Sequence, residues 1–527
     1  MSNKLPSDSP PIGSTVSLNS SDESKKTRNA SPDPAHLEKV SDPNQPPVVG
    51  QGAELVPKEV EKKLMRKLDI HIIPWAMWMY LMSFMDRVNI GNARIYGLEE
   101  DLGIAGTNQY QLAVSILFVT YCLFEAPSNS VLKRFQPARW LGVLTFCWGL
   151  VATFSAWVNN INSLIACRLL LGLFEAGLFP GLVVYLTMFY NRRNIALRTS
   201  FLYGTAALSG ALGGLVAYGI GDLDGVRGWS GWRWIILING IPTIFTGILT
   251  PWVLPNSPET ASFLSEDDKR NMILLRQQEY GQTASAQHFD KRDAIRAFKD
   301  WKTWAFAIAQ WSVLCMLYSF SVFLPTILQE LNGVRDNNPG GWTNPQIQAL
   351  TVPVYMLGAI VYISTSFYAD KVQMRGPFVI VFNCIALLGY ILLIANINMQ
   401  ASFAGCFILA IGVYTTSGFP MTWIGVNNPR YGKRAIASGL QLTVGNSSGV
   451  AAPFLFSTQF APLYRPGYAA CIGLMTMSLC IYTTLHLYFL KQNRDRKAGK
   501  QDWKMEGKTE EEIAEMGEDS PRYFFIP

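Results

Sequence analysis

The chain has 527 residues, of which 49% are hydrophobic and only 16% are charged, with a formal net charge of +6 at pH 7. Soluble domains carry roughly 25% charged residues, so this composition argues against a soluble multidomain protein. The modest positive charge does not suggest a nucleic-acid partner. Apolar residues instead come in long blocks that repeat along the chain, which indicates a protein embedded in a lipid bilayer.

The first 56 residues are rich in Ser, Pro, Asn and Asp and have no apolar core, so they are not a signal peptide. We expect a disordered tail over 1–56. A membrane-spanning helix needs about 20 mostly apolar residues. The first half, 57–254, contains six such stretches, at about 70–92, 109–132, 139–158, 161–189, 199–221 and 233–254.

A polar segment follows at 255–300, and its part from Ser265 to Gln278 has acidic residues first and Arg276 late, as in a capped surface helix. The second half, 301–490, contains six further apolar stretches. They lie at about 301–329, 346–369, 377–397, 400–425, 434–459 and 467–490, and a polar tail covers 491–527. The sequence therefore predicts an all-α membrane protein of twelve spans in two six-helix halves.

Orientation follows from the basic residues, because short cytoplasmic loops carry an excess of Lys and Arg. Such residues cluster before the first span, in every second loop after it, and in the C-terminal tail. Both termini and the central segment are therefore expected to be cytoplasmic, and the even number of spans agrees. We expect the plasma membrane, with a vacuolar or other internal membrane left open.

The fifth span of each half carries a pair of glycines four residues apart. These pairs are Gly210 with Gly214, and Gly445 with Gly449. Small residues at this spacing let two helix backbones approach closely. Their placement in corresponding spans indicates an internally repeated transporter with its site between the halves.

Charged residues inside spans are costly and are candidates for function. Asp86 and Arg87 lie late in the first span, and Arg168 and Glu175 lie in the fourth. At 1.5 Å per residue, Asp86 and Arg168 are both about 10 Å below the outer surface, so the two could meet. Glu175 is about 10 Å deeper on nearly the same helix face as Arg168.

Two interpretations of these charges remain open. They form an ion-pair cluster that only holds spans 1 and 4 together, or the arginines bind an anionic substrate and the carboxylates carry protons. Glu125 in span 2 is either structural or functional. Polar candidates for substrate contact also lie in other spans, where core packing is the alternative role. They are Tyr121, Tyr318, Trp423, Gln441 and Asn446.

Other chemistry has little support in the sequence. The eight cysteines lie in or beside apolar blocks without a C-x-x-C pair, and the four histidines are far apart. This spacing predicts no disulfide framework and no metal site. There is no Gly-rich phosphate loop after a strand and no nucleophile–base pair, so we expect neither a cofactor nor an enzyme.

Three motifs give the chain its resemblance to a known family. They are FMDRVNIGNA at 84–93, RLLLGLFEAG at 168–177 and ADKVQMR at 369–375. With these motifs the chain resembles the major facilitator superfamily, and within it the anion:cation symporter family. It looks closest to the fungal allantoate permease branch, which includes nicotinate, pantothenate and biotin carriers. The resemblance covers about residues 65–490.

The resemblance implies roles for individual residues. Asp86 and Glu175 match the family's protonatable carboxylates, while Arg87 and Arg168 match its arginines that handle substrate charge. Asp370, Lys371 and Arg375 match the superfamily's gating loop motif. In the first half, Leu132 replaces the Asp of that motif, which puts in doubt a gating ion pair from the corresponding loop.

The function expected from this resemblance is proton-coupled symport of a small organic anion, such as nicotinate, pantothenate or allantoate, by alternating access. The partners would be the substrate, protons and lipid, and the chain would be a monomer. One alternative is export of an acidic metabolite made by a biosynthetic gene cluster. Another is a nutrient sensor that binds without transporting.

Overall fold

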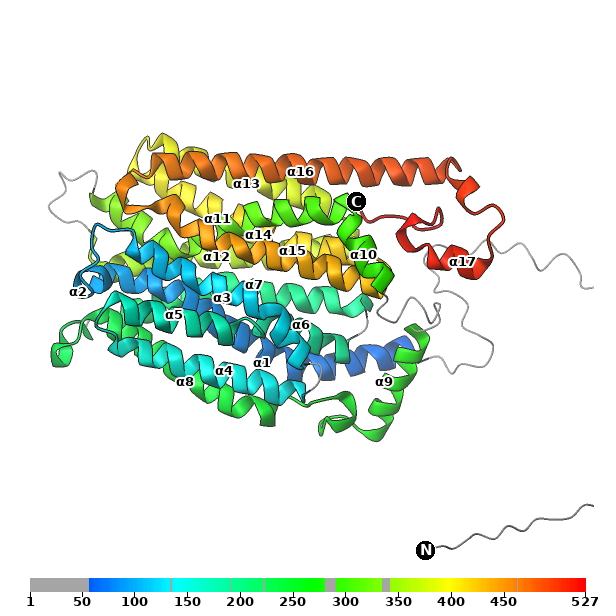
Figure 1. The fold of residues 1–527 in the computed structure, drawn as a ribbon, viewed down its shortest axis with the longest axis horizontal. Helices are drawn as coiled ribbons and strands as arrows, with labels where there is room; N and C mark the ends of the chain where they lie inside the picture. Colours follow the sequence, from blue (N-terminus) through cyan, green and yellow to red (C-terminus); the bar gives the residue numbers. More distant parts are fainter. Residues whose placement is uncertain are drawn as a thin grey trace, which may run out of the picture. The chain divides into compact units, whose positions relative to one another are not determined.

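The computed structural model describes residues 56–132, 135–190, 192–220, 223–279, 291–333, 342–461 and 463–527. Every regular element in these ranges is a helix (Figure 1). The tail expected to be disordered, 1–56, lies outside the described residues except for Val56.

The long helices of the first half are α1 (Lys58–Ala93), α3 (Gln109–Leu132), α4 (Pro137–Phe154), α5 (Ile161–Glu175), α6 (Leu178–Phe189), α7 (Arg192–Ile220) and α8 (Gly231–Val253). Those of the second half are α11 (Trp301–Gly333), α12 (Asn344–Val372), α13 (Gly376–Ala395), α14 (Met399–Val426), α15 (Tyr431–Ala451) and α16 (Arg465–Lys497). Between the halves lie α9 (Glu266–Glu279) and α10 (Lys291–Lys299).

Short elements complete the described chain. They are a π-helical turn at Arg94–Leu98, the short helices α2 (Glu99–Asp101) and α17 (Glu510–Glu515), and 3₁₀ turns at Ser155–Trp157, Val226–Gly228, Pro258–Thr260, Ala452–Phe456, Thr458–Phe460, Asp502–Lys504 and Gly517–Asp519.

Helix starts follow from local capping. Asn160 and Asn398 each accept a hydrogen bond from the backbone N–H three residues on, at 2.8 and 2.6 Å, and so begin α5 and α14. Ser265 and Asp268 exchange side-chain-to-backbone bonds of 3.2 Å at the start of α9. The capped helix expected after Ser265 is therefore present.

Ten helices of the described residues are long and apolar enough to cross a membrane. Two more long helices, α1 and α15, are more polar, because α1 carries buried charges and α15 begins with basic residues and has a run of Ser, Asn and Gln. Counting α5 and α6 as one broken span, these helices make twelve, which confirms the all-α fold of twelve spans.

Two predicted spans differ from the helices observed. The fourth is broken after Glu175, where Ala176 and Gly177 separate α5 from α6. Pro180 lacks the N–H that would bond the carbonyl of Ala176, so the helix cannot continue unchanged. The eleventh ends as an α-helix at Ala451 and continues as 3₁₀ turns, because Pro453 removes the next donor.

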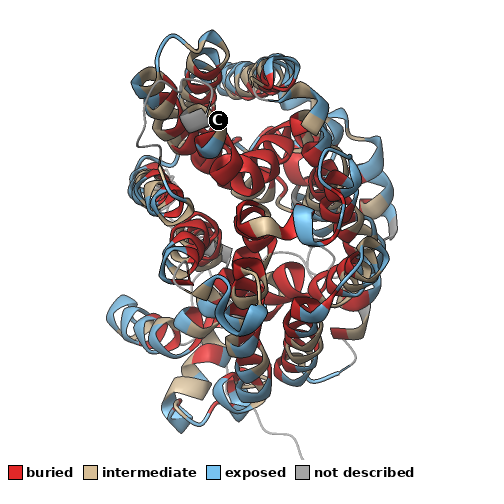
Figure 2. Cartoon of the chain, turned by 90° about the vertical axis from the view of Figure 1, so that its left-hand side faces the viewer, coloured by how far each residue is buried: buried red, intermediate tan, exposed pale blue. Residues whose placement is uncertain are grey.

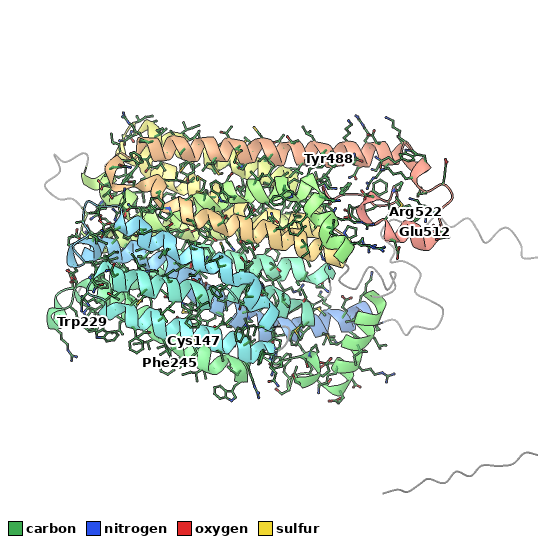
Figure 3. The ribbon with its side chains drawn as sticks, in the orientation of Figure 1. Cys147, Trp229, Phe245, Tyr488, Glu512 and Arg522 are labelled. Carbon is green, nitrogen blue, oxygen red and sulfur yellow. The ribbon has the colours of Figure 1, made fainter. Side chains whose placement is uncertain are left out.

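We call the end of the bundle that carries the start of α1, α9, α10 and α17 the inner end, and the opposite end, with α2, the outer end (Figure 1). Buried residues lie where the helices face one another (Figure 2). Large apolar side chains such as Phe245, which is 60% exposed, cover the outside of the bundle (Figure 3). An apolar exterior suits contact with lipid.

Three of the four paired glycines lie at contacts between the halves, whereas Gly445 packs on Leu314 and Gln310 of α11 in its own half. Added methyl groups on Gly210 and Gly214 would meet Tyr355 and Thr351 of α12, whereas one on Gly449 would meet Phe118 of α3. Thus α7 of the first half packs on α12 of the second, and α15 packs on α3. The fifth span of each half therefore makes a close helix contact with the other half.

The outer end is held closed by hydrogen bonds between the halves. Asn344 donates to the carbonyl of Ile95 at 2.8 Å, and Ser457 donates to Asn108 at 2.6 Å. Gly91 of α1 lies so close to the backbone of Val322 in α11 that a Cβ would be 2.0 Å from the carbonyl oxygen. Side chains buried midway along the bundle are therefore covered on the outer side.

Candidate functional site

A buried ion pair joins α1 to the break between α5 and α6. The Nε of Arg87 donates to Oε1 of Glu175 at 2.7 Å, and the hydroxyl of Ser83 donates to the same oxygen. Glu175 is 2% exposed and is the last residue of α5. Discontinuous helices in transporters often mark binding sites, because the break frees backbone groups beside a cavity.

Aromatic rings from both halves surround the Arg87 guanidinium. Its central carbon lies 4.7 Å from the ring centre of Tyr121 in α3 and 5.9 Å from that of Tyr318 in α11. Phe84 and Phe118 lie at 5.4 and 5.6 Å. Rings at these distances attract a cation through their quadrupoles. Arg87 therefore lies where the two halves meet.

A hydrogen-bonded chain extends this cluster into the second half. The hydroxyl of Tyr318 donates to Oδ1 of Asn446 in α15 at 2.8 Å. In the same helix, Thr443 donates to the carboxyl of Glu125 in α3 at 3.2 Å. Five of the predicted site residues thus meet around one interface, namely Arg87, Tyr121, Glu175, Tyr318 and Asn446.

Glu125 belongs to this interface although the sequence left its role open. It lies four residues after Tyr121, so both side chains are on one face of α3. It is 3% exposed, and no Lys or Arg of the described residues lies within ion-pair distance of it. The i, i+4 spacing from Tyr121 was the signal that could have placed it in the site.

Asp86 and Arg168 form a separate polar region inside the first half. Oδ2 of Asp86 accepts from the indole N–H of Trp148 in α4 at 2.7 Å. Arg168 is 5% exposed, and its Nε has no hydrogen-bond partner in the described residues. Among the described residues Asp86 and Arg168 form no salt bridge, although they lie near enough for their charges to interact. Consecutive helix residues point about 100° apart, so Asp86 and Arg87 face different neighbours.

Gln441 lies in another polar cluster, within the second half. Its amide N–H reaches Oε1 of Gln310 at 3.5 Å, and the hydroxyl of Tyr482 donates to the same oxygen at 3.3 Å. Gln310 itself donates to the carbonyl of Ser417 at 2.9 Å. This network joins α11, α14, α15 and α16 rather than the two halves.

Trp423 and the gating loop motif lie at the inner end, away from Arg87. The indole of Trp423 donates to the carbonyl of Ile526 at 2.8 Å. Asp370 pairs with Arg375, whose main chain begins α13, while Lys371 is exposed. The contact between Trp423 and Ile526 could not be predicted from the sequence, because the two residues are far apart in the chain.

The comparisons with known proteins agree with this architecture. The Major Facilitator Superfamily model matches residues 76–453. An uncharacterized transporter of Schizosaccharomyces pombe is 37% identical over 444 residues, which are 84% of this chain and 86% of the relative. The high-affinity nicotinic acid transporter of Saccharomyces cerevisiae is 30% identical over 438 residues, covering 83% and 79%.

Among solved structures, a bacterial homolog of the human lysosomal transporter Spinster superposes with a TM-score of 0.61 at 15% identity. The superposition covers 83% of this chain and 99% of that one. At this identity it shows the shared fold alone. The family match and the relatives, together with the twelve helices, give the conclusion. The chain belongs to the major facilitator superfamily and is a secondary transporter in a membrane, not an enzyme.

Proposed function

We propose that the chain carries a small organic anion together with protons by alternating access, as a member of the anion:cation symporter family and its allantoate permease branch. The observation that supports this proposal is the buried pair of Arg87 and Glu175, where α1 and the broken fourth span face Tyr318 of the other half. A guanidinium there has the planar geometry that a carboxylate needs for two hydrogen bonds.

In this proposal Glu175 and the carboxylate of the substrate compete for the guanidinium of Arg87, and this competition couples transport of the substrate to transport of protons. While Glu175 is ionised, it accepts from Arg87, and a second carboxylate nearby would be repelled. When Glu175 takes up a proton, Arg87 is released to bind the carboxylate of the substrate. When the substrate leaves, Glu175 loses its proton and pairs again with Arg87. Transport of the anion therefore requires a proton on Glu175.

Asp86 and Arg168 supply a second proton site and a second positive charge in this proposal. The indole N–H of Trp148 fixes the carboxyl of Asp86, and Arg168 retains an unused N–H. A buried donor without a partner is costly, and a substrate oxygen would satisfy it. Tyr318 and Asn446 would orient the neutral part of the substrate from the second half.

The substrate class follows from the same chemistry. A fork of N–H donors beside aromatic rings suits a small carboxylate with a flat or apolar body. One relative is named as a nicotinic acid transporter, so nicotinate is the first compound to test, with pantothenate and allantoate beside it. The plasma membrane is the proposed location.

The experiment is uptake of these labelled acids into liposomes that contain the purified protein, with and without an inward proton gradient. We expect the gradient to drive accumulation by the unaltered protein. Glu175→Gln should bind and exchange substrate but should not accumulate it, because the neutral amide can no longer compete for Arg87. Glu266→Gln is the matched control, since Glu266 is 89% exposed on α9.

Three outcomes would contradict parts of this proposal. Normal gradient-driven accumulation by Glu175→Gln would show that Glu175 does not couple transport to protons. Transport that does not respond to the proton gradient would show that protons are not carried with the substrate. Normal uptake of all three acids by cells that lack the protein, with loss of a secreted acidic metabolite, would replace uptake by export.

A further inference from the structure

Residues 515–527 fold back onto the inner end of the second half, and we call them the C-terminal strap (Figure 1). Their contacts reach α11, α13, α14, α15 and α16 of the second half, and within the described residues their hydrogen bonds and ion pairs stay in that half. The strap is therefore a feature of one half rather than a latch between the two.

Main-chain hydrogen bonds hold the end of the strap. Asn427, which follows α14, exchanges two bonds with Ile526, of 2.8 and 2.9 Å, and Asn493 of α16 exchanges two of 2.8 Å with Phe525. Trp423 donates a further bond to the carbonyl of Ile526. Paired amide bonds of this kind recognise an extended backbone, much as a neighbouring strand does.

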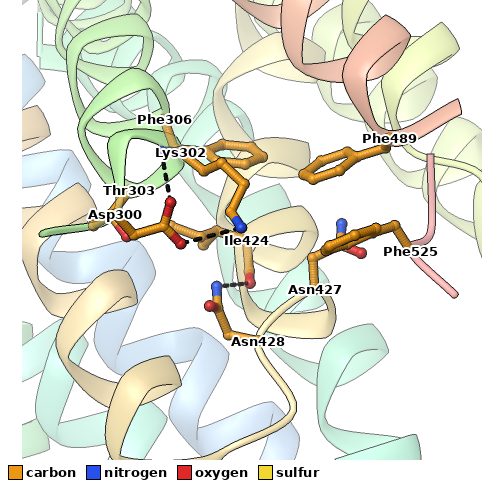
Figure 4. Close-up of a pocket in the computed structure, with 9 residues that line it drawn as sticks. All are labelled: Asp300, Lys302, Thr303, Phe306, Ile424, Asn427, Asn428, Phe489 and Phe525. Carbon is orange, nitrogen blue, oxygen red and sulfur yellow. Dashed lines mark hydrogen bonds and ion pairs between the residues drawn. The ribbon is translucent and has the colours of Figure 1, made fainter. Parts of the chain in front are cut away.

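Phe525 anchors the strap among aromatic and basic side chains, which we call its pocket; Phe489 and Lys302 of this set are drawn with Phe525 in Figure 4. The Phe525 ring is 4% exposed, lies 4.8 Å from the ring of Phe489 in a stacked arrangement, and has the guanidinium of Arg496 at 4.7 Å. The ammonium of Lys302 lies 5.5 Å from the same ring. The preceding Phe524 is 46% exposed. Of the two neighbouring aromatic side chains, the pocket therefore buries Phe525 and leaves Phe524 exposed.

Buried charges fix the start of the strap. Lys433 of α15 pairs with both Glu518 of the strap and Asp300, the latter at 2.5 Å. Arg430 donates to Asp293 of α10 at 2.8 Å and to the carbonyl of Glu515 at 2.7 Å. Without the strap, Lys433 and Arg430 would each lose a partner, and burial of an incompletely paired charge is unfavourable.

The last bonds of the strap reach the gating loop motif. The main-chain N–H groups of Arg375 and Gly376 donate to the carbonyl oxygen of Pro527 at 3.0 and 3.2 Å. These N–H groups begin α13 and have no acceptor within the helix. The Arg375 side chain beside them is 5% exposed and paired with Asp370. The strap therefore covers the end of this segment at Arg375 and Gly376, while residues 371–373 stay exposed.

We propose that the inner end of the second half is a peptide-binding site, that residues 523–527 are its resident ligand, and that the bound peptide holds the loop segment 370–376 in place. The ligand class is an extended peptide with a buried aromatic residue at the position of Phe525. The site is independent of the proposed transport mechanism, because none of its residues touches Arg87 or Glu175.

Limited trypsin digestion of the full-length protein in detergent tests both parts of the proposal. Trypsin cuts after Arg522 and after Arg375, and both peptide bonds need the strap to leave before they fit a protease. Phe525→Ala should speed cleavage at both sites by roughly tenfold or more, since it empties the pocket. Phe524→Ala, the matched exposed neighbour, should digest as the unaltered protein does. Intact mass and fragment mass report each cut separately.

Each outcome has a defined meaning. Equal cleavage rates for Phe525→Ala and the unaltered protein at both sites would overturn the proposal. If Phe525→Ala is cleaved faster after Arg522 but not after Arg375, the bound peptide does not hold segment 370–376 in place, and that part of the proposal is wrong. If Phe525→Ala aggregates, Asn493→Ala gives the same test, because it removes both bonds to the Phe525 backbone while leaving the aromatic pocket intact. Unchanged cleavage in Asn493→Ala would then overturn the proposal.

Discussion

The two halves of the bundle place their buried charges differently. In the first half, Arg87, Glu125, Arg168 and Glu175 are buried within membrane-spanning helices, and the partly buried Asp86 lies beside Arg87, while Glu99 and Arg198 are buried nearer the two ends of the bundle. In the described part of the second half, the groups near that interface are the neutral Tyr318 and Asn446. The buried charges of that half, with those of α10 and the strap, gather at its inner end. They are Asp293, Arg375, Arg430, Lys433, Arg496 and Glu518.

This difference separates two uses of charge on one repeated scaffold. Charges in the middle of a bundle are expensive and are kept for substrates and protons. Charges at the inner end are closer to water and here connect loops, α10 and the strap. The first half would therefore supply the electrostatics of transport, while the second half would supply orientation and a fixed inner end.

The largest effect is expected from Arg87→Met, which leaves the carboxylate of Glu175 buried without its cation. Breaking a buried pair on one side costs about 3–5 kcal/mol, so thermal unfolding in detergent should shift strongly and uptake should be lost. The double variant Arg87→Met with Glu175→Met should recover much of the stability but none of the uptake. A double variant no more stable than Arg87→Met would show that the pair does not govern stability.

Arg168→Lys separates the second arginine from the first. Arg168 makes no ion pair in the described residues, so the unfolding temperature should hardly change. Loss of the fork of donors should weaken substrate affinity by about tenfold, measured from the concentration dependence of uptake. Normal affinity in this variant would remove Arg168 from substrate binding.

Tyr318→Phe tests the contribution of the second half. The ring beside Arg87 remains, but the bond to Asn446 is lost. The expected cost is about 0.5–1.5 kcal/mol, seen as a modest fall in both unfolding temperature and affinity. Tyr368→Phe is the control, since Tyr368 is 60% exposed on α12. Equal behaviour of the two variants would deny Tyr318 a role at the interface.

The smallest effect concerns pH at the inner end. Burial raises the pKa of Asp300, but Lys302 and Lys433 outweigh it and leave the pKa below its ordinary value. A carboxyl whose pKa is lowered in the folded protein stabilises the fold at any pH above its ordinary pKa. This stabilisation is lost as the pH falls through the pKa that the carboxyl has in the folded protein. The protection factors of the amides of residues 523–526, which correct for the intrinsic pH dependence of hydrogen exchange, should therefore fall below about pH 4. Asp300→Asn should remove this pH step, and a step of equal size in that variant would exclude Asp300 as its source.

Sequence patterns alone gave much of the architecture. Twelve spans follow from hydropathy, because a helix in lipid satisfies its own backbone and must be apolar over its length. The glycine pairs foretold close helix contacts, and the motifs around Asp86, Arg168 and Asp370 identified the superfamily. Arg87 and Glu175 were also predicted as site residues from the sequence, because a charge within a span is rare.

Tertiary structure decided which of these groups meet. Depth along a span placed Asp86 level with Arg168, but rotation about the helix axis turned Asp86 to Trp148 and Arg87 to Glu175. Sequence spacing fixes height within a bundle, whereas packing of neighbouring helices fixes rotation. Trp423 and Asn427 met the strap through contacts about a hundred residues apart in the chain. Local patterns contain no record of such contacts, which is why the strap was seen only in the folded protein.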